Sequence, residues 1–372
     1  MSRRAPSDNR EVDPRVNGWM RQAVAVAAAS QPHPNPRVGA VVLNPGGDEV
    51  SAAFHEAPGT PHAEVLALRA AGSAAPGSTV VTTLEPCSHH GRTPPCTDAL
   101  IDAGVTRVII GATDPDVRVA GSGIAKLRAA GIDVIAGILE DEVIAADPGY
   151  FHHRRTGRPR FRVKLAATLD GQIAASDGTS QWITSAAARD DAHQLRAVAD
   201  AVVVGAGTIR ADNPLLDVRV DSFSGRQPRP VVIAGDGPLP TERRLYERDP
   251  VIYAPRPLET GVSTEVVVAA GPDGVDLAAV AKDLADRGIL EVLVDGGPTL
   301  ATSFVKGGLA DEITLYFGAK LAVGTGLPML TGPFATLADA MGVEILEVMK
   351  LGSDIRIDAR PLIDSPPQGG PA

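Results

Sequence analysis

Four side chains in this 372-residue chain have the types and spacing needed to activate water at a metal ion. His62 and Glu64 are separated by one residue, and the two cysteines, Cys87 and Cys96, lie together in one short segment. Imidazole nitrogen and thiolate sulfur are common zinc ligands, and a catalytic zinc with three protein ligands keeps its fourth position for water. Because zinc lowers the pKa of that water to ~7, such a cluster would provide a nucleophile at neutral pH.

The order of these residues is typical of zinc deaminases, in which a glutamate shortly after the histidine carries protons without binding the metal. Glu64 would then deliver a proton to the departing amine. Two alternatives stay open at this point: a structural zinc site closed by His89 or His90, and two buried cysteines without a metal. Residues 88–95 separate the cysteines, a longer gap than in the commonest deaminase signature. Its glycine, arginine and paired prolines predict a rigid loop that forms part of the substrate pocket.

The second half of the chain contains two glycine-rich turns that could bind a nucleotide cofactor. The first, at 205–210, fails as a dinucleotide-binding fingerprint, because Arg210 replaces the third glycine and no helical pattern begins there. The second turn follows a predicted strand over 291–295 and leads through Gly296, Gly297 and Pro298 into a predicted helix. Backbone N–H groups and the helix dipole at such a turn suit a phosphate. A tight connection without a ligand is an equal alternative on these residues alone.

The elements that must position these residues alternate between strands and helices. This alternation predicts α/β folds with largely parallel sheets. A polar, basic stretch at 145–160, rich in turn-forming residues, interrupts the pattern, so we place a domain boundary there. The predicted organisation is a flexible arm over 1–16, a first domain over 17–150, a second domain over 158–364 and a disordered tail over 365–372. The two halves share no internal repeat and are expected to have different folds.

Composition excludes several classes of protein. Hydrophobic residues make up 44% of the chain but aromatic residues only 3%, so the cores must be mainly aliphatic. A net charge of −10 argues against a surface that binds nucleic acid as a whole. No apolar run is long enough to span a membrane, and two cysteines cannot form a disulfide scaffold. We therefore expect a cytoplasmic protein with no nucleic-acid or membrane partner.

The segment 83–96 closely resembles a known family. Its sequence, TLEPCSHHGRTPPC, resembles the diagnostic segment of the bifunctional deaminase/reductases of riboflavin biosynthesis. Segments 34–39 and 61–65 match the same family, and the match runs from about Trp19 to Arg360. The resemblance implies a cytidine-deaminase-like α/β/α sandwich in the first domain. The residues that it implies there are the zinc ligands His62, Cys87 and Cys96, the proton carrier Glu64 and the substrate-orienting Asn35. Ala40 stands where the family often has cysteine, which leaves the ligand set intact.

The second domain resembles the reductase half of this family, whose fold is similar to that of dihydrofolate reductase. The matching segments, in order, are 164–171, 180–184, 195–196, 212–214 and 296–300. The resemblance implies NADPH contacts from Ala166, Trp182, Thr208, Asp212, Gly297, Pro298, Thr299, Leu300, Ala301, Thr302 and Ser303. The implied substrate contacts are Ser180, Arg196, Leu216, Arg219 and Asp295. Asp295 stands where the family usually carries glutamate, and its shorter side chain would shift contacts to substrate hydroxyl groups.

The family resemblance implies two consecutive reactions. The first is zinc-dependent removal of the 2-amino group of 2,5-diamino-6-ribosylamino-4(3H)-pyrimidinone 5′-phosphate. The second is reduction of the ribosyl group by NADPH, which gives 5-amino-6-ribitylaminouracil 5′-phosphate. By family, a homodimer would form through the second domain. Two alternatives are a nucleic-acid-editing deaminase, which predicts a basic surface and a short cysteine gap, and a non-catalytic zinc-stabilised nucleotide sensor, which predicts the loss of Glu64.

Overall fold

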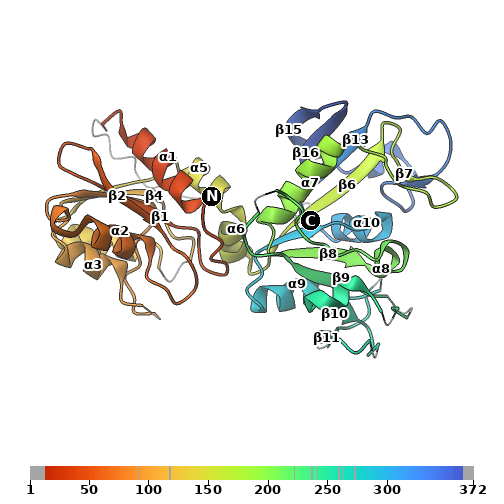
Figure 1. Ribbon diagram of the computed structural model, residues 1–372, viewed down its shortest axis with the longest axis horizontal. Coiled ribbons are helices and arrows are strands. Elements are labelled where there is room, and N and C mark those ends of the chain that lie inside the picture. Colours follow the sequence, from red (N-terminus) through yellow and green to blue (C-terminus); the bar gives the residue numbers. More distant parts are fainter. Residues whose placement is uncertain are drawn as a thin grey trace, which may run out of the picture. The chain divides into compact units, whose positions relative to one another are not determined.

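The computed structural model describes residues 13–362 except 92, 117–118, 222, 236–237, 241, 259, 263 and 272–273. The chain divides into two compact units, Met1–Gly157 and Arg158–Ala372. Each unit has its own β-sheet with helices packed against it (Figure 1), which confirms the predicted α/β class. Residues 1–12 of the predicted arm and the whole predicted tail lie outside the described residues. Within the described ranges, no helix combines the length and apolarity needed to cross a bilayer.

The N-terminal unit is built on a five-stranded sheet with the order β2-β1-β3-β4-β5. Its strands are β1 (Gly39–Leu43), β2 (Glu49–Phe54), β3 (Thr79–Leu84), β4 (Arg107–Ala112) and β5 (Asp133–Ala136). Strands β3, β4 and β5 are parallel, as predicted, but β1 runs antiparallel to both β2 and β3. The alternation pattern did not reveal β2, because this edge strand contains alanine, serine and glutamate and follows β1 through a tight turn closed by Gly47 N–H and Asn44 O.

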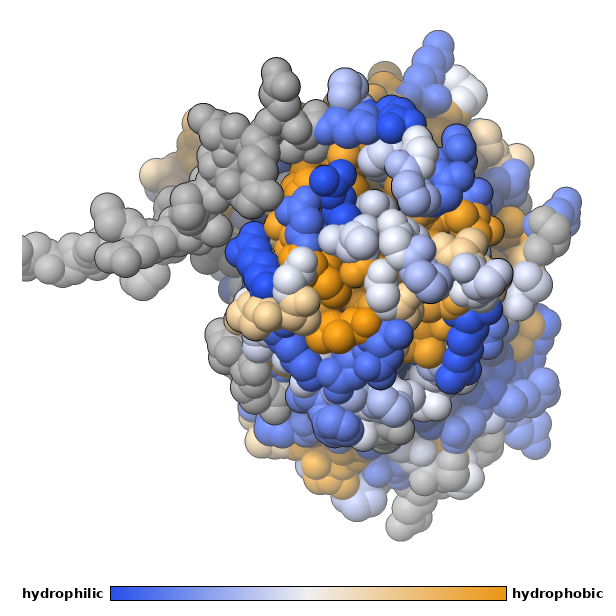
Figure 2. All heavy atoms as spheres, turned by 90° about the vertical axis from the view of Figure 1, so that its left-hand side faces the viewer, coloured by the Kyte–Doolittle hydropathy of each residue, from blue (hydrophilic) through white to orange (hydrophobic). Residues whose placement is uncertain are grey.

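Helices flank both faces of this sheet. They are α1 (Val16–Ala27), α2 (Ala63–Ala71), α3 (Cys96–Asp102), α4 (Ser122–Ala129), α5 (Glu140–Ala146) and α6 (Pro148–Thr156), with a 3-10 turn at Gly72–Ala74. Figure 1 shows α1 and α5 on one side of the sheet and α2 and α3 on the other. A Cβ at Gly39 would lie 2.1 Å from the Ala23 carbonyl oxygen, so the close packing of α1 on β1 requires glycine there. Figure 2 shows hydrophobic residues between groups of hydrophilic ones on one face of the molecule.

The turn-rich stretch at 145–160 is more regular than its sequence suggests, because α6 occupies most of it. Pro148 stands at the start of this helix, where its missing N–H costs no hydrogen bond. Tyr150 and Phe151 are both buried, at 3% and 4% exposure, and they anchor the helix to the rest of the unit. The helix ends at Thr156, and the next residue, Gly157, adopts the left-handed conformation that glycine favours. Charged residues at other positions of α6 obscured the two aromatic anchors in the sequence pattern.

The C-terminal unit contains a nine-stranded sheet with the order β11-β10-β9-β8-β12-β6-β13-β16-β15. The strands are β6 (Arg160–Thr168), β8 (Ala201–Gly205), β9 (Arg229–Ile233), β10 (Val251–Ala254), β11 (Thr264–Val267), β12 (Glu291–Val294), β13 (Ala310–Gly318), β15 (Val343–Leu351) and β16 (Asp354–Pro361). All neighbouring pairs are parallel except those that involve β16, which is antiparallel to β13 and β15. A small separate sheet pairs β7 (Gln172–Ala174) with β14 (Leu327–Pro328).

Two aliphatic cores lie on the two faces of this sheet. The helices are α7 (Ala186–Val198), α8 (Ala206–Asp212), α9 (Leu277–Asp286) and α10 (Pro298–Lys306), with 3-10 turns at Arg244–Arg248 and Leu337–Asp339. One core joins α9 and α10 to the sheet, and the other joins α7 and α8 to it. Alternate residues of the same strand enter different cores: Val203 belongs to the first core, whereas Val202 and Val204 belong to the second.

The two glycine-rich turns each lead from a strand into a helix. The prediction that no helix begins at the 205–210 turn is wrong, because α8 starts at Ala206. This helix is too short to show an extended apolar period, and its buried face consists of Ala206 and Ile209. The predicted helix after Gly297 is confirmed as α10, with Pro298 in its first turn. A Cβ at Gly296 would lie 2.7 Å from Leu300 Cδ2, so a larger residue there would displace the Leu300 side chain.

Candidate metal centre and cofactor cavity

Three predicted zinc ligands meet in the N-terminal unit. The ligand atoms of His62, Cys87 and Cys96 all lie within 4.8 Å of one another. His62 directly precedes α2, Cys87 follows β3, and Cys96 is the first residue of α3. His62 Nδ1 lies 3.1 Å from Cys96 Sγ and 3.6 Å from Cys87 Sγ, so this nitrogen faces both sulfur atoms. One imidazole nitrogen and two sulfurs form a donor set that suits Zn²⁺.

Interactions within the cluster favour the thiolate form that a metal needs. The Cys96 thiol and the His62 ring hold the pKa of Cys87 well below its usual range. The Cys96 N–H also points to Cys87 Sγ at 3.4 Å. Pairing with Cys87 and burial raise the pKa of Cys96. A bound cation would favour deprotonation of the second thiol.

The other His62 nitrogen has its own partner. Nε2 lies 3.3 Å from Thr93 Oγ1 in the loop between the cysteines. A hydrogen bond on the non-ligating nitrogen fixes the orientation of a metal-binding histidine. The sequence pattern did not single out Thr93 for this part. His89 and His90 are both exposed, and among the described residues the metal-binding cluster includes neither.

Glu64 lies beside the cluster on the first turn of α2. Its Oε2 atom is 3.5 Å from Cys96 Sγ, and the residue is only 3% exposed. Burial raises the pKa of the Glu64 carboxyl above its usual value, although the nearby His62 opposes this shift. A carboxyl group in this environment takes up a proton more readily than one in water. The position of Glu64 therefore suits proton transfer beside the cluster.

Asn35 approaches the cluster from the segment between α1 and β1. Its Nδ2 atom lies 2.9 Å from His55 Nε2, and His55 Nδ1 lies 3.2 Å from the Pro61 carbonyl oxygen. Burial lowers the pKa of His55, which favours a neutral ring that donates from Nδ1 and accepts at Nε2. The His55 and His62 rings meet edge to face at 5.2 Å. Sequence reasoning missed His55, which lies between the short segments 34–39 and 61–65 on which the resemblance rests.

A second missed residue is Glu85, which is 3% exposed and immediately precedes Pro86 and Cys87. Its carboxylate accepts hydrogen bonds from the N–H groups of Gly121 and Gly123 at 2.9 Å each. These bonds attach the loop that follows β3 to the start of α4. Glu85 therefore supports the backbone that carries Cys87.

If the cluster binds zinc, the metal should change the reactivity of the cysteine thiols. With zinc bound, Cys87 and Cys96 should resist a thiol reagent, because both sulfurs bind the metal. Removal of zinc with a chelator should make the half-buried Cys87 reactive, while Cys96 stays shielded by burial, and should abolish deaminase activity; added Zn²⁺ should reverse both changes. Thiol titration and metal analysis would measure this on the native protein. If the thiols reacted equally with and without zinc, the cluster would not be the metal site.

The C-terminal unit contains a large cavity of about 1090 Å³. The starts of α8 and α10 both border it, as do the cationic residues Arg210 and Lys306. Backbone N–H groups at a helix start and arginine or lysine side chains are suited to phosphate groups. The size and lining of the cavity therefore fit a phosphorylated dinucleotide.

Most of the predicted cofactor residues line this cavity. They are Thr208, Asp212, Gly297, Pro298, Thr299, Leu300 and Ser303. Three others do not line it: Ala166 packs against the core, Ala301 is fully buried in the core, and Thr302 accepts a hydrogen bond from Thr331 N–H at 2.8 Å. Burial raises the pKa of Asp212.

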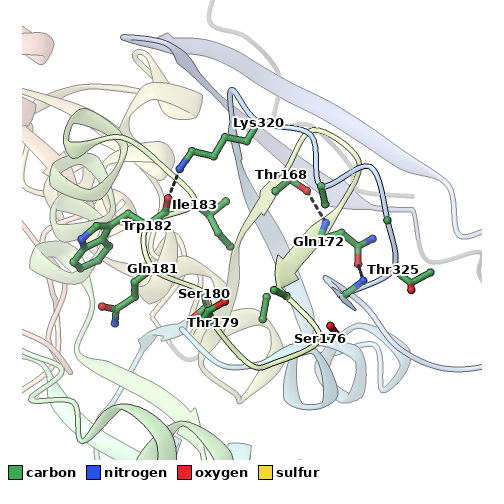
Figure 3. Close-up of a pocket in the computed structure, with 15 residues that line it drawn as sticks. Thr168, Gln172, Ser176, Thr179, Ser180, Gln181, Trp182, Ile183, Lys320 and Thr325 are labelled. Atoms are coloured by element: carbon green, nitrogen blue, oxygen red, sulfur yellow. Dashed lines mark hydrogen bonds between the residues drawn. The ribbon is translucent and has the colours of Figure 1, made fainter.

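Trp182 lines a neighbouring cavity of about 300 Å³, shown in Figure 3. Its side chain is 59% exposed and lies against the Arg189 guanidinium, 4.2 Å from the ring centre. Lys320 Nζ donates a hydrogen bond to the Trp182 carbonyl oxygen. Ser180, one of the predicted substrate residues, lines both cavities. The two cavities therefore share a border at the segment that carries Ser180 and Trp182.

Asp295 forms a charged cluster with Lys164 and Arg196 at the carboxyl end of β12. Asp295 Oδ1 lies 3.2 Å from Lys164 Nζ, and Oδ2 lies 2.5 Å from Arg196 NH2. Burial alone would raise the pKa of Asp295, but the two cations reverse this effect and hold it below its usual range. Within the described residues, Arg196 Nε is buried and has no hydrogen-bond partner. Such a donor could bind a substrate oxygen.

The remaining predicted substrate residues differ in exposure. Leu216 is buried at 3% exposure and has a positive φ of 55°, so its backbone is the part that could reach a ligand. The Arg219 side chain is 67% exposed and lies 3.5 Å from an Asp217 oxygen. Neither residue borders the two cavities described above.

Comparison with known proteins matches each half of the chain to a different protein family. Residues 15–112 match the cytidine and deoxycytidylate deaminase zinc-binding region, and residues 159–357 match the RibD C-terminal domain. The riboflavin biosynthesis protein RibD of Escherichia coli is 37% identical over 91% of this chain and 97% of its own length. RibD of Mycobacterium tuberculosis is 41% identical over 84% of each chain.

Solved structures show the same relationship. Acinetobacter baumannii RibD superimposes with a TM-score of 0.86 at 35% identity and covers 93% of this chain and 99% of its own. A deaminase/reductase from Thermotoga maritima gives a TM-score of 0.81 at 32% identity, with 93% and 98% of the two chains covered. Neither a nucleic-acid-editing deaminase nor a non-catalytic sensor accounts for the reductase half. The chain therefore belongs to the RibD family of riboflavin biosynthesis, whose members join a zinc-dependent deaminase to an NADPH-dependent reductase.

Proposed function

We propose that the N-terminal unit deaminates 2,5-diamino-6-ribosylamino-4(3H)-pyrimidinone 5′-phosphate at its 2-amino group. The main support is the meeting of His62 Nδ1 and the sulfurs of Cys87 and Cys96 within 4.8 Å, with Glu64 beside them. These three residues would hold zinc, which when bound activates water at neutral pH. The family and the donor set agree on this chemistry.

Several residues of the N-terminal unit would each contribute to this reaction. Glu64 accepts a proton at its carboxylate and delivers it to the departing amine, which leaves as ammonia. Asn35 orients the pyrimidine ring by a hydrogen bond, and its side chain is already held by His55. Thr93 keeps the His62 ring in the orientation that directs Nδ1 to the sulfurs. Burial of Glu64 raises the pKa of its carboxyl, which favours proton uptake.

The C-terminal unit would reduce the ribosyl group of the deaminated product to a ribityl group. NADPH supplies the hydride when bound, and the cavity bordered by α8 and α10 would hold it. Ser180, Arg196, Leu216, Arg219 and Asp295 are the proposed substrate contacts, and Arg196 and Arg219 would face its phosphate. Among the described residues of this unit, no side chain stands out as an acid for this step. Positioning and electrostatics would therefore supply most of the catalysis.

Two assays on the purified chain test this function. The zinc-loaded protein should release ammonia from the diaminopyrimidine phosphate. It should then oxidise NADPH only when the deaminated product is present. Ammonia release without NADPH oxidation would refute the reductase assignment, and NADPH oxidation alone would refute the deaminase assignment.

We infer that the protein forms a homodimer through the C-terminal unit. Strand β15 is at the edge of the nine-stranded sheet, and pairing with alternate residues of β16 places Val343, Ile345 and Val348 on one face. Their exposures are 47%, 60% and 59%. An exposed apolar edge strand favours association with a second copy, and paired symmetric chains are the commonest assembly.

The Ile345→Asp substitution should convert this dimer to a monomer, because it places a charge in the apolar strip. Light scattering after size-exclusion chromatography would measure the mass. Glu344→Gln is the matched control, since Glu344 lies on the opposite face of β15 and is expected to leave the dimer intact. A wild-type protein that is monomeric at micromolar concentration would refute the proposed interface.

A further inference from the structure

One buried carboxylate in the N-terminal unit has no part in the chemistry described above. Asp147 lies between α5 and α6 and is only 3% exposed. Its Oδ1 atom lies 2.8 Å from His33 Nε2, and the side chains of this pair are 4% and 3% exposed. Its Oδ2 atom accepts a hydrogen bond from the Arg37 N–H at 2.8 Å. Both oxygens of Asp147 are therefore bonded to the segment between α1 and β1.

These two bonds lie on either side of Asn35. His33 is two residues before Asn35 and Arg37 is two residues after it. The Asn35 N–H also donates to the Pro32 carbonyl oxygen at 3.0 Å, which makes the segment a closed turn. Asp147 thus holds both ends of the turn that presents Asn35.

The contacts of Asn35 continue toward the metal centre. Its amide nitrogen lies 2.9 Å from His55, and His55 is bonded to the Pro61 carbonyl oxygen at 3.2 Å. Pro61 directly precedes His62. A displacement of the 33–37 turn would therefore move the Asn35 amide relative to the metal ligands.

The element that carries Asp147 is well fixed. The adjoining helix α6 buries Tyr150 and Phe151, and the Phe151 N–H donates to the Asp147 carbonyl oxygen. A site is most accurate when its contacting residues are held by a rigid second layer. Loss of the carboxylate would also remove the acceptor of the buried His33 ring and of the half-buried Arg37 N–H.

We propose that Asp147 is a positioning residue for the deaminase, which acts through His33 and the Arg37 N–H to fix the Asn35 amide. This proposal rests on the proposed function of the N-terminal unit. Asp147 does not touch the reacting atoms, so its loss should weaken substrate placement and leave zinc binding intact. Sequence patterns at 145–160 concealed it, because Asp-Pro-Gly is typical of an exposed turn.

Steady-state kinetics of the full-length, zinc-loaded chain would test the proposal. Asp147→Asn should lower the deaminase kcat/KM ~10- to 100-fold, the size expected when a contact is misplaced. Zinc content and NADPH oxidation should remain at wild-type levels. Adding Asp147→Asn to Asn35→Ala should cause no further loss, because both changes remove the same contact. Additive losses, or a wild-type kcat/KM in Asp147→Asn, would overturn the proposal.

Two further variants separate positioning from general destabilisation. His33→Gln keeps an N–H donor for Asp147 and should retain most of the activity, whereas His33→Ala should resemble Asp147→Asn. Glu142→Gln is the matched control, because this exposed carboxylate on α5 pairs with Arg21 and makes no contact with the turn. If His33→Gln lost as much activity as His33→Ala, the hydrogen bond would not be the cause.

Amide hydrogen exchange provides a readout that does not depend on activity. Residues 33–37 should exchange faster in Asp147→Asn than in wild type, while α2 and α3 keep their protection. Unchanged exchange in the turn would overturn the positioning proposal even if ammonia were released. If the wild-type chain released no ammonia but the turn still lost protection, the proposed function would fail and the attachment of the turn would stand.

Discussion

The Glu64→Gln substitution is expected to reduce ammonia release ~10²- to 10⁴-fold, the range that a positioned acid–base group contributes. Glutamine preserves the shape of the side chain but cannot take up and release a proton at this position. Zinc content should remain at the wild-type level, because the ligand atoms belong to His62, Cys87 and Cys96. NADPH oxidation with the deaminated product should also remain unchanged, because it depends on the other unit.

To test this, ammonia release and NADPH oxidation would both be measured on the same preparation of Glu64→Gln. Glu56→Gln is a suitable control, since Glu56 is exposed and lies outside the metal cluster. A loss of both activities in a folded Glu64→Gln protein would contradict the assignment of the two reactions to separate sites. Full deaminase activity in this variant would exclude Glu64 as the proton carrier.

The Asp295→Asn substitution should have the largest effect on the reductase unit. It would leave Lys164 and Arg196 close together without their shared counter-charge, and all three side chains are less than one-fifth exposed. Removing one partner from such a buried cluster costs about 3 kcal/mol or more. NADPH oxidation should fall strongly, because both cations would lose the acceptor that orients them.

The urea dependence of each activity would measure this effect, with ammonia release from the other unit as an internal reference. Asp286→Asn is the matched control, because Asp286 forms an exposed pair with Lys282 on α9. Such a pair contributes at most ~1 kcal/mol. If NADPH oxidation were equally resistant to urea in wild type and in Asp295→Asn, the charged cluster would not stabilise the unit.

The effect of Asp295→Asn on the free energy of unfolding should depend on pH. Lys164 and Arg196 hold the pKa of Asp295 below its usual value in the folded protein. The charged carboxylate therefore stabilises the fold fully above the pKa that it has in the unfolded chain, ~3.9. This stabilisation is lost as the pH falls through the folded value. The difference in unfolding free energy between wild type and Asp295→Asn should stay constant from neutral pH to ~5 and narrow below ~4.

Much of the fold was predictable from the alternation of strands and helices. The strand predicted over 291–295 is β12, and the helix predicted after Gly297 is α10. Strand β2 was missed because its side chains follow no clear apolar alternation, and its pairing with β1 stabilises it. Helix α6 was missed because a helix that begins with proline and is rich in charged residues resembles a linker until its aromatic anchors are known to be buried.

The candidate metal ligands could be predicted from the sequence, whereas the residues that hold the surrounding loops in place could not. Histidine and cysteine are scarce in this chain, so their spacing carried most of the information. Thr93, Glu85 and Asp147 are ordinary residue types in loops, and their parts depend on hydrogen bonds across the fold. The departure at Asp295 was visible in the sequence, but its contacts with both Lys164 and Arg196 required the structure.

The division of the chain after Gly157 determines how mutations in the two halves of the gene combine. Each half encloses its own reactive centre, so a substitution that ruins one chemical step need not damage the other. Two defective alleles with lesions in opposite halves could together restore vitamin synthesis in one cell, provided that the intermediate can diffuse between the protein molecules. Natural selection can therefore tune, exchange or separate the two halves of the gene as independent modules.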